Sequence, residues 1–250
     1  MSDLPRPALR PEQLADTPAQ PTAQLSLRAV TLLEMASVSS SVLITAWVIS
    51  PLQLRQRWLE VVPGLLALLL IVNSHRLHGE GPRELGFTTR HFWRAAKLLT
   101  LPMIVGTGLL IGGGYLAGSF SFAQRASLLL AALPFWGLLQ QYVLQAFIYR
   151  RLKLILLASQ MSAERQAERT RVAIVIAALL FGLIHAPNWP LMMLTLIAGL
   201  VWCWVYEHAP NLYAIAISHG LMSAVAMGSL PPWLLQSMRV GYRYFIFQRF

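Results

Sequence analysis

Apolar residues occur in long runs along the chain, and short polar segments separate these runs. Seven runs stand out, at residues 28–50, 59–73, 98–118, 127–148, 172–185, 190–206 and 212–230. An α-helix rises about 1.5 Å per residue, so roughly 17 to 25 apolar residues are enough to cross a bilayer. The pattern therefore predicts an all-α fold, a polytopic membrane bundle of about 7–8 transmembrane helices. The aromatic and basic segment 233–250 is expected to form an interfacial or eighth helix.

Composition supports a membrane protein, because 56% of the residues are hydrophobic and only 12% are charged. A soluble protein of this length needs more charge on its surface. The net charge of +10 is concentrated in two connections, residues 75–97 and 149–171. By the positive-inside rule both connections and the N-terminus are expected on the cytoplasmic side, and we expect an integral protein of a bacterial inner membrane. With no aromatic-basic nucleic-acid module, we expect membrane lipids and no nucleic acid as partners.

The domain organisation follows from the same pattern. Residues 1–25 contain five prolines and no apolar core, and are expected to be a disordered cytoplasmic tail. Residues 26–250 are expected to form a single transmembrane domain.

Two histidines, His185 and His219, fall within the late apolar runs. A histidine in a membrane helix is costly, and it usually faces a partner, water or a metal inside the bundle. The two imidazoles could donate to an oxyanion, act as a general base, or bind a divalent metal such as zinc, and purely structural hydrogen bonding is the alternative. Asn188 and Ser223 follow these histidines at helical spacing and would lie beside them.

The fourth run carries three glutamines, Gln140, Gln141 and Gln145. Their spacing allows Gln145 to share one inward face with Gln140 or Gln141, where they either form a site or simply bond neighbouring helices. No acidic residue lies between Glu84 and Glu164. An amide can orient a water molecule but cannot take its proton, so this helix supplies no general base.

Other polar residues receive structural interpretations. His75, His78, His91 and His208 fall in polar connections and are expected to be solvated. Glu207, at the end of a run, is expected to pair with a basic loop. The single cysteine, Cys203, excludes an intrachain disulfide and a cysteine-based zinc site.

The order and spacing of several short motifs resemble the CPBP family, which comprises the type II CAAX prenyl endopeptidases and the bacteriocin-processing Abi intramembrane proteases. The similar segments span roughly residues 83–225 and comprise Glu84-Leu85-Gly86-Phe87, then Phe181, His185 and Asn188, and finally Tyr206, Glu207, Asn211, Leu212 and His219. The resemblance implies a helical fold, and a site that cleaves membrane-associated or lipidated polypeptides.

The chain departs from the family at the reactive positions. The family motif Glu-Glu-x-x-x-Arg is replaced by Gln140, Gln141 and Gln145, and a usual asparagine is replaced by Ser223. In the family the first glutamate is thought to activate water, while the histidines and the asparagine bind the oxyanion or a metal. The resemblance thus implies catalytic positions at Gln140, Gln141, His185, Asn188 and His219, pocket positions at Gln145, Phe181 and Ser223, and a metal, if any, at His185 and His219. Two hypotheses remain: an intramembrane endopeptidase with altered chemistry, and an inactive pseudoprotease that binds a membrane segment or a lipidated partner.

Overall fold

The computed structural model describes residues 21–52, 61–121, 132–157 and 161–247, and it contains helices and no strand within these ranges. The N-terminal half contains α1 (Pro21–Ile44), which continues as the short turns η2 (Thr45–Ile49) and η3 (Ser50–Leu52), then α2 (Val62–Leu77) and α3 (Phe92–Leu116). One continuous helical rod follows, made of α5 (Leu133–Gln141), η5 (Tyr142–Tyr149) and α6 (Arg150–Leu156). The C-terminal half contains α7 (Ala163–Leu183), α8 (Trp189–His208), α9 (Leu212–Ser229), α10 (Pro232–Leu235), η6 (Gln236–Met238) and α11 (Tyr242–Phe247).

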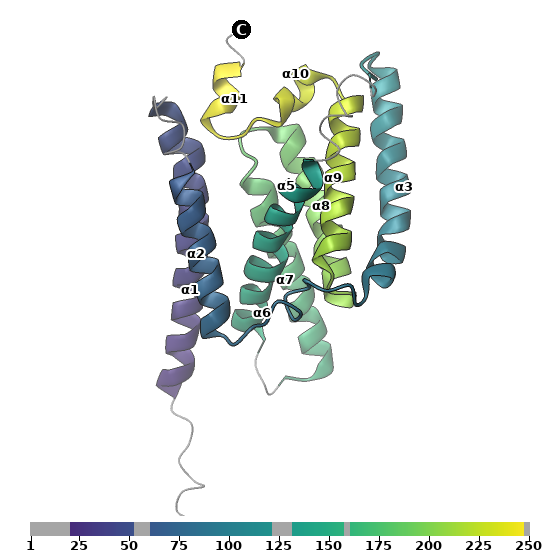
Figure 1. The fold of residues 1–250 in the computed structure, drawn as a ribbon. Coiled ribbons are helices and arrows are strands. Elements are labelled where there is room, and N and C mark those ends of the chain that lie inside the picture. Colours follow the sequence, from purple (N-terminus) through teal and green to yellow (C-terminus); the bar gives the residue numbers. More distant parts are fainter. Residues whose placement is uncertain (1–20, 53–60, 122–131, 158–160, 248–250) are drawn as a thin grey trace, which may run out of the picture.

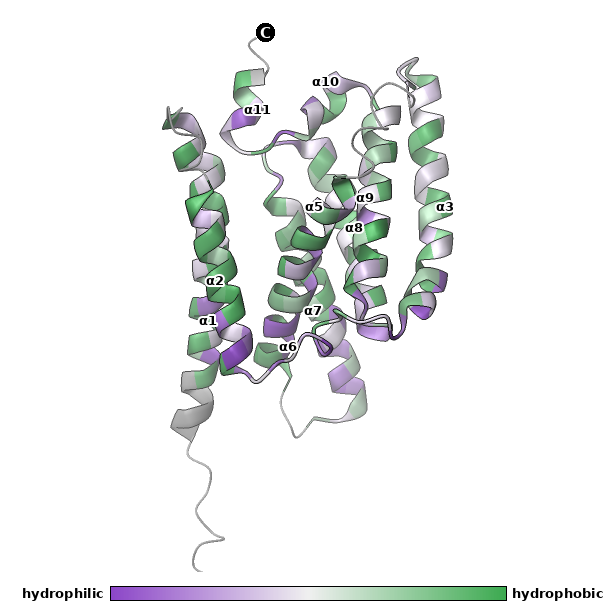
Figure 2. Cartoon of the chain, viewed as in Figure 1, coloured by the Kyte–Doolittle hydropathy of each residue, from purple (hydrophilic) through white to green (hydrophobic). Residues whose placement is uncertain are grey.

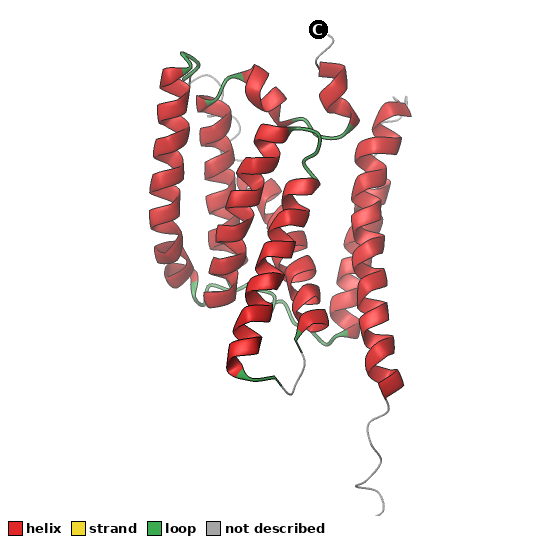
Figure 3. Cartoon of the chain, turned by 180° about the vertical axis from the view of Figure 1, so that it is seen from behind, coloured by secondary structure: helices red, strands yellow, loops and turns green. Residues whose placement is uncertain are grey.

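The long helices run roughly side by side, with α1 and α2 at one edge, α3 at the other, and the remaining long helices between them (Figures 1 and 3). Within the described residues, four helical segments are long and apolar enough to cross a membrane: Leu27–Leu52, Phe92–Leu116, Trp189–His208 and Leu212–Ser229. The chain is therefore an all-helical integral membrane protein, as the sequence predicts, while the count of 7–8 spans stays a prediction.

Several boundaries differ from the sequence-based ones. The run at 172–185 belongs to a helix that begins nine residues earlier, because the polar stretch from Ala163 consists of good helix formers and Ser162 caps it, accepting a hydrogen bond from the Arg165 N–H. The C-terminal segment forms short helices in place of one long helix. Residues 1–20 of the expected tail lie outside the described residues, and α1 begins at Pro21. The expected starts of two runs, at residues 59 and 127, also lie outside the described residues.

Polar residues gather at one end of the bundle, where α2 meets the α2–α3 connection and where α6 and α7 approach each other (Figure 2). The main buried cluster joins side chains of α1, α2, α3, η5, α6, α7, α8 and α9. Close helix packing is concentrated at a few glycines rather than spread along the glycine-rich α3: a Cβ added at Gly114 would overlap the backbone of Ser229, whereas Gly108 and Gly112 face open space. Gly106 also lies close to α9, since its added Cβ would lie 2.8 Å from the end of the Met222 side chain. Small residues thus bring α3 against α9 at two levels.

Candidate functional site in the helical bundle

The site is set by a close crossing of α5 and α9. A Cβ added at Gly220 would lie 2.7 Å from the Pro134 backbone nitrogen, and one added at Gly137 would lie 2.9 Å from the Ala216 carbonyl oxygen. Only glycine allows the two backbones to approach this closely. The crossing brings Gln141, one turn after Gly137, directly against the α9 face that carries a histidine.

Two of the three glutamines form a hydrogen-bonded chain that ends at His219. Gln145 Nε2 donates to Gln141 Oε1 at 3.1 Å, and Gln141 Nε2 donates to His219 Nδ1 at 3.0 Å. Both glutamine side chains are fully buried, so of the two pairings that the spacing allows, Gln141 with Gln145 is the one that shares an inward face. Because an amide nitrogen can only donate, His219 Nδ1 must accept, and the proton of the neutral ring sits on Nε2.

The His219 ring is held in a narrow aromatic slot. Trp202 stacks on it, with ring centroids 4.5 Å apart and an interplanar angle of 21°, and Phe181 approaches edge-on with centroids 6.0 Å apart. Trp202 is itself fixed, since its indole nitrogen donates to Ser218 Oγ at 2.9 Å. Stacking and the amide bond together fix the direction in which His219 Nε2 points.

His185 lies in the turn after α7 and has the opposite arrangement of its ring nitrogens. Its Nδ1 lies 2.7 Å from the Phe181 carbonyl oxygen, which can only accept, so Nδ1 carries the proton. The neutral ring therefore presents an unprotonated Nε2. Phe181 packs against both histidines, with its centroid 5.0 Å from that of His185, so the two imidazoles line one buried region. One histidine offers an acceptor there and the other offers a donor.

Asn188 is placed differently from the sequence-based expectation. Because α7 ends at Leu183 and α8 begins at Trp189, Asn188 does not continue the helix of His185. It caps α8, its Oδ1 accepting from the Leu191 N–H at 3.3 Å. The Asn188 side-chain amide donates to the Leu235 and Arg239 carbonyl oxygens at 2.6 and 3.1 Å. Both amide hydrogens are therefore bonded to the segment that follows α9.

The remaining predicted positions, Gln140 and Ser223, are half-buried. Neither forms a hydrogen bond with the residues that the structure describes, so their polar groups are free to bind a ligand or water.

A catalytic zinc site does not fit these donors. Zinc enzymes commonly supply three protein ligands from histidine, cysteine or carboxylate. His185 and His219 supply two, and over the described ranges no group of three or more such residues could hold a metal ion. The two histidines alone therefore do not make up the protein ligands of a catalytic zinc.

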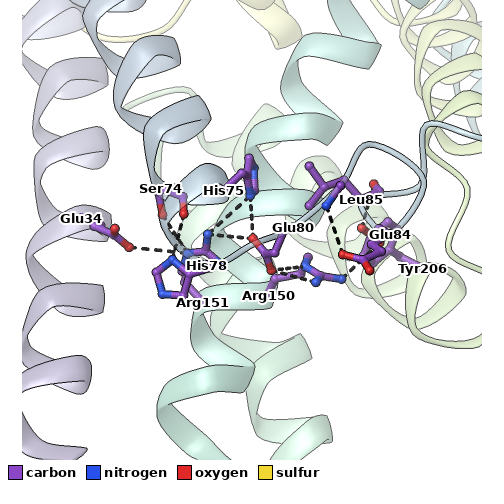
Figure 4. Close-up of polar contacts among 11 residues, drawn as sticks. Glu34, Ser74, His75, His78, Glu80, Glu84, Leu85, Arg150, Arg151 and Tyr206 are labelled. Carbon is purple, nitrogen blue, oxygen red and sulfur yellow. Dashed lines mark hydrogen bonds and ion pairs between the residues drawn. The ribbon is translucent and has the colours of Figure 1, made fainter. Parts of the chain in front are cut away.

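A second polar cluster, which sequence analysis missed, lies at the polar end of the rod that carries the glutamines (Figure 4). Arg151 is fully buried, and its guanidinium contacts Glu80 at 2.8 Å, Ser74 at 3.0 Å and Glu34 at 3.5 Å. It thus joins α6 to α1, α2 and the α2–α3 connection. The sequence signal was the adjacent pair of arginines directly after an apolar run, which alone does not show which of the two turns inward.

His75 belongs to this cluster, so the expectation that it is solvated is wrong. It is 4% exposed, and its Nδ1 lies 2.7 Å from the Glu80 carboxylate. Burial alone would raise the pKa of Glu80, but its hydrogen bonds with His75, Arg151 and Arg150 outweigh burial and hold that pKa well below its usual value. The expectation for Glu207 is confirmed, because Lys153 of the basic connection approaches it at 2.7 Å.

The remaining motif residues converge on the turn between α8 and α9. Tyr206 donates its hydroxyl hydrogen to the Leu85 carbonyl oxygen at 2.9 Å, and the Gly86 carbonyl oxygen accepts from the Leu212 N–H at 3.0 Å. Gly86 has a φ of +89° and lies against Leu212 and the Tyr206 ring, where a side chain would be crowded. Asn211 caps α9 and donates to the Arg90 carbonyl oxygen at 2.9 Å. Segments far apart in sequence therefore meet at one joint that sets the start of the His219 helix.

The comparisons with known proteins agree with this arrangement. Residues 122–225 match the family model described as type II CAAX prenyl endopeptidase Rce1-like. No curated protein and no solved structure matches the chain. The matched region contains the three glutamines, both histidines and the α8–α9 residues of the joint, while Leu85, Gly86 and Arg90 precede it. This match covers less than half of the chain, and it agrees with the resemblance to the CPBP family that the sequence motifs indicate.

Proposed function

We propose that this CAAX-protease-like membrane protein cleaves membrane-associated polypeptides slowly, through a histidine pair that works without the family's glutamates. The observation that carries this proposal is the complementary arrangement of the two imidazoles. His185 presents an acceptor nitrogen, because its Nδ1 is bonded to the Phe181 carbonyl oxygen. His219 presents a donor nitrogen, because its Nδ1 is bonded to the Gln141 amide.

This pair suits peptide hydrolysis. His185 Nε2 takes a proton from a water molecule as the water oxygen attacks the carbonyl carbon of the scissile peptide bond. His219 Nε2–H donates to the carbonyl oxygen as it becomes negatively charged. The proton on His185 then passes to the leaving amide nitrogen as the carbon–nitrogen bond breaks. The free amide of Gln140 orients the water, while Asn188, whose hydrogens are engaged elsewhere, holds the loop that carries His185 in place.

The setting that we propose is a bacterial inner membrane with the N-terminus in the cytoplasm, and residues 26–250 acting as one transmembrane unit. The start of α1, the α2–α3 connection, the end of α6 and the start of α7 all lie at one end of the bundle (Figure 1). The α2–α3 connection, α6 and the start of α7 are rich in arginine and lysine, which supports one basic side. Substrates would be membrane-associated or lipidated polypeptides. Their scissile bond would have to reach the region around Phe181, which is buried among α7, α8 and α9.

The experiment is to restore a carboxylate with Gln140→Glu and to measure cleavage of a membrane-associated reporter peptide by purified protein. A well-placed general base contributes about 10²–10⁴-fold, so turnover should rise by at least about 10²-fold. Gln140→Met, which has a similar size and no polar group, should lower turnover. A folded Gln140→Glu protein with unchanged turnover would contradict the assignment of water activation to this region.

The alternative is a pseudoprotease that holds a membrane segment or a lipidated protein. It is favoured by the bonding of the glutamines, because Gln145 bonds Gln141 and Gln141 bonds His219 without any charged group. This alternative predicts that His185→Ala leaves every cleavage product unchanged while it alters the proteins that co-purify with the chain. Loss of a cleavage product in the His185→Ala variant would support the endopeptidase and contradict the pseudoprotease.

A further inference from the structure

A cleft of about 500 Å³ opens between the N-terminal half of α7 and the C-terminal end of α8, away from the histidine pair. The two helices touch at Gly199, where an added Cβ would lie 3.2 Å from Ala178 Cα. The cleft lies beyond this contact, toward the polar end of the bundle, and Ile174 forms its apolar wall. Its polar lining comes from Gln166, Thr170 and Arg171 of α7 and from Glu207 and His208 of α8.

The charges of this cleft leave one cation uncompensated. Arg171 is exposed and makes no ion pair or hydrogen bond within the described residues, not even with Glu168 one turn earlier. Glu207 does not serve as its partner, because Lys153 Nζ lies 2.7 Å from both of its carboxylate oxygens and the Tyr149 hydroxyl lies 2.6 Å from one. A guanidinium beside a hydroxyl and an amide is suited to a phosphate group.

His208 and Trp204 complete the wall on the α8 side. His208 Nδ1 bonds the Trp204 carbonyl oxygen at 2.8 Å, which holds the His208 ring in the lining of the cleft. The two rings lie 4.7 Å apart, and Trp204 is 42% exposed. An exposed tryptophan at the end of a membrane helix is typical of the interface between lipid and water.

The sequence of α7 changes from polar to apolar at the cleft. Gln166, Thr170 and Arg171 precede Val172, and Val175 and Leu179 continue the Arg171 face at helical spacing, 46% and 45% exposed. A ligand held by Arg171 therefore meets polar groups on one side and lipid-facing apolar side chains on the other. This combination fits a molecule with a phosphate head and a hydrocarbon tail better than a soluble phosphate.

We propose that the α7–α8 cleft binds the headgroup phosphate of an anionic phospholipid, with Arg171 as its main ligand and the acyl chains along Val175 and Leu179. Basic pockets between membrane helices at the cytoplasmic side are a recognised arrangement for such headgroups. The site is separate from the histidine pair and requires no cleavage activity.

The test is native mass spectrometry of the full chain in detergent, titrated with phosphatidylglycerol or with phosphatidylcholine of the same acyl chains. The wild-type protein should retain phosphatidylglycerol preferentially, and Arg171→Gln should weaken this binding about fivefold. Arg169→Gln is the matched control, since it removes the same charge two residues away on a face that does not line the cleft. Thr170→Val should weaken phosphatidylglycerol binding without any change of charge.

Each contrary outcome overturns the proposal. Equal retention of the two lipids by the wild-type protein means that no headgroup site exists. Equal losses in Arg171→Gln and Arg169→Gln mean that only the overall charge attracts the lipid. Displacement of phosphatidylglycerol by an equal concentration of soluble glycerol 3-phosphate means that the cleft takes free phosphates and not lipid.

Discussion

Gln141 and His219 are 78 residues apart in the sequence, yet a 3.0 Å hydrogen bond joins them inside the bundle. The bond carries no net charge, but it decides which nitrogen of His219 holds the proton. The two histidines thereby differ in which ring nitrogen can donate a hydrogen bond, although both lie among aromatic side chains.

This difference predicts the tautomers of the two rings. At neutral pH, His219 should carry its proton on Nε2 and His185 on Nδ1, because their respective partners are an amide N–H and a carbonyl oxygen. The nitrogen chemical shifts of ¹⁵N-labelled histidine in detergent distinguish the two forms. Gln141→Leu should mix the tautomers of His219 and leave those of His185 unchanged. A proton on Nδ1 of His219 in the wild-type protein would reverse the proposed roles.

The glycine crossing predicts a localised sensitivity to added methyl groups. Gly220→Ala should destabilise the protein by about 1–3 kcal/mol, because its Cβ would meet the backbone at Pro134 and push the two helices apart. Gly108→Ala serves as the control, since nothing lies within 4 Å of its added Cβ and alanine favours a helix. Thermal midpoints in detergent compare them. Equal midpoints for the two variants would argue against the close crossing.

The burial of Arg151 predicts that its replacement lowers stability far more than replacement of an exposed arginine at the same end of the bundle. Arg151→Met should cost about 3–5 kcal/mol, because it removes the buried guanidinium that pairs with both Glu80 and Glu34. Arg76→Met, at an exposed position on α2, should change stability by less than about 1 kcal/mol. Unfolding in mixed micelles with increasing sodium dodecyl sulfate measures both. An Arg151→Met protein as stable as the wild-type protein would show that the cluster does not hold the helices together.

Glu80 also predicts a pH dependence. Its pKa in the folded protein is depressed, so its stabilising contribution is fully present above the ordinary glutamate pKa of about 4.3 and is lost as pH falls below that value. The thermal midpoint of the wild-type protein should drop as pH falls from about 5 to about 3, because this range spans the ordinary glutamate pKa. Glu80→Gln should start lower at pH 7 and fall less steeply. Parallel curves for the two proteins would place the acid-sensitive group elsewhere.

The sequence predicts the parts of this structure that depend on local pattern. The apolar runs locate the long helices, and the spacing of Gln141 and Gln145 places them on one face. His185 and His219 are drawn to one buried region because an isolated imidazole in an apolar bundle is costly. The Phe181 ring lies between them, as the spacing of Phe181 and His185 on α7 allows.

The parts that the sequence does not predict depend on contacts between distant segments. Asn188 was expected beside His185, but the helix ends first and its amide bonds the Leu235 and Arg239 carbonyl oxygens instead. His75 was expected in water, but Glu80 and Arg151 draw it into the bundle. Periodicity cannot show such pairings, because each requires the relative placement of helices that are far apart in the chain.

The central claim is that the histidine pair cleaves membrane-associated polypeptides, and a comparison of protein N-termini in native host membranes tests it most directly. The wild-type chain should be compared with a His185→Ala and His219→Ala double variant at matched expression. We expect at least one new N-terminus in a membrane-associated protein that is present with the wild-type chain and absent with the double variant. Identical sets of N-termini in the two membranes would contradict the claim.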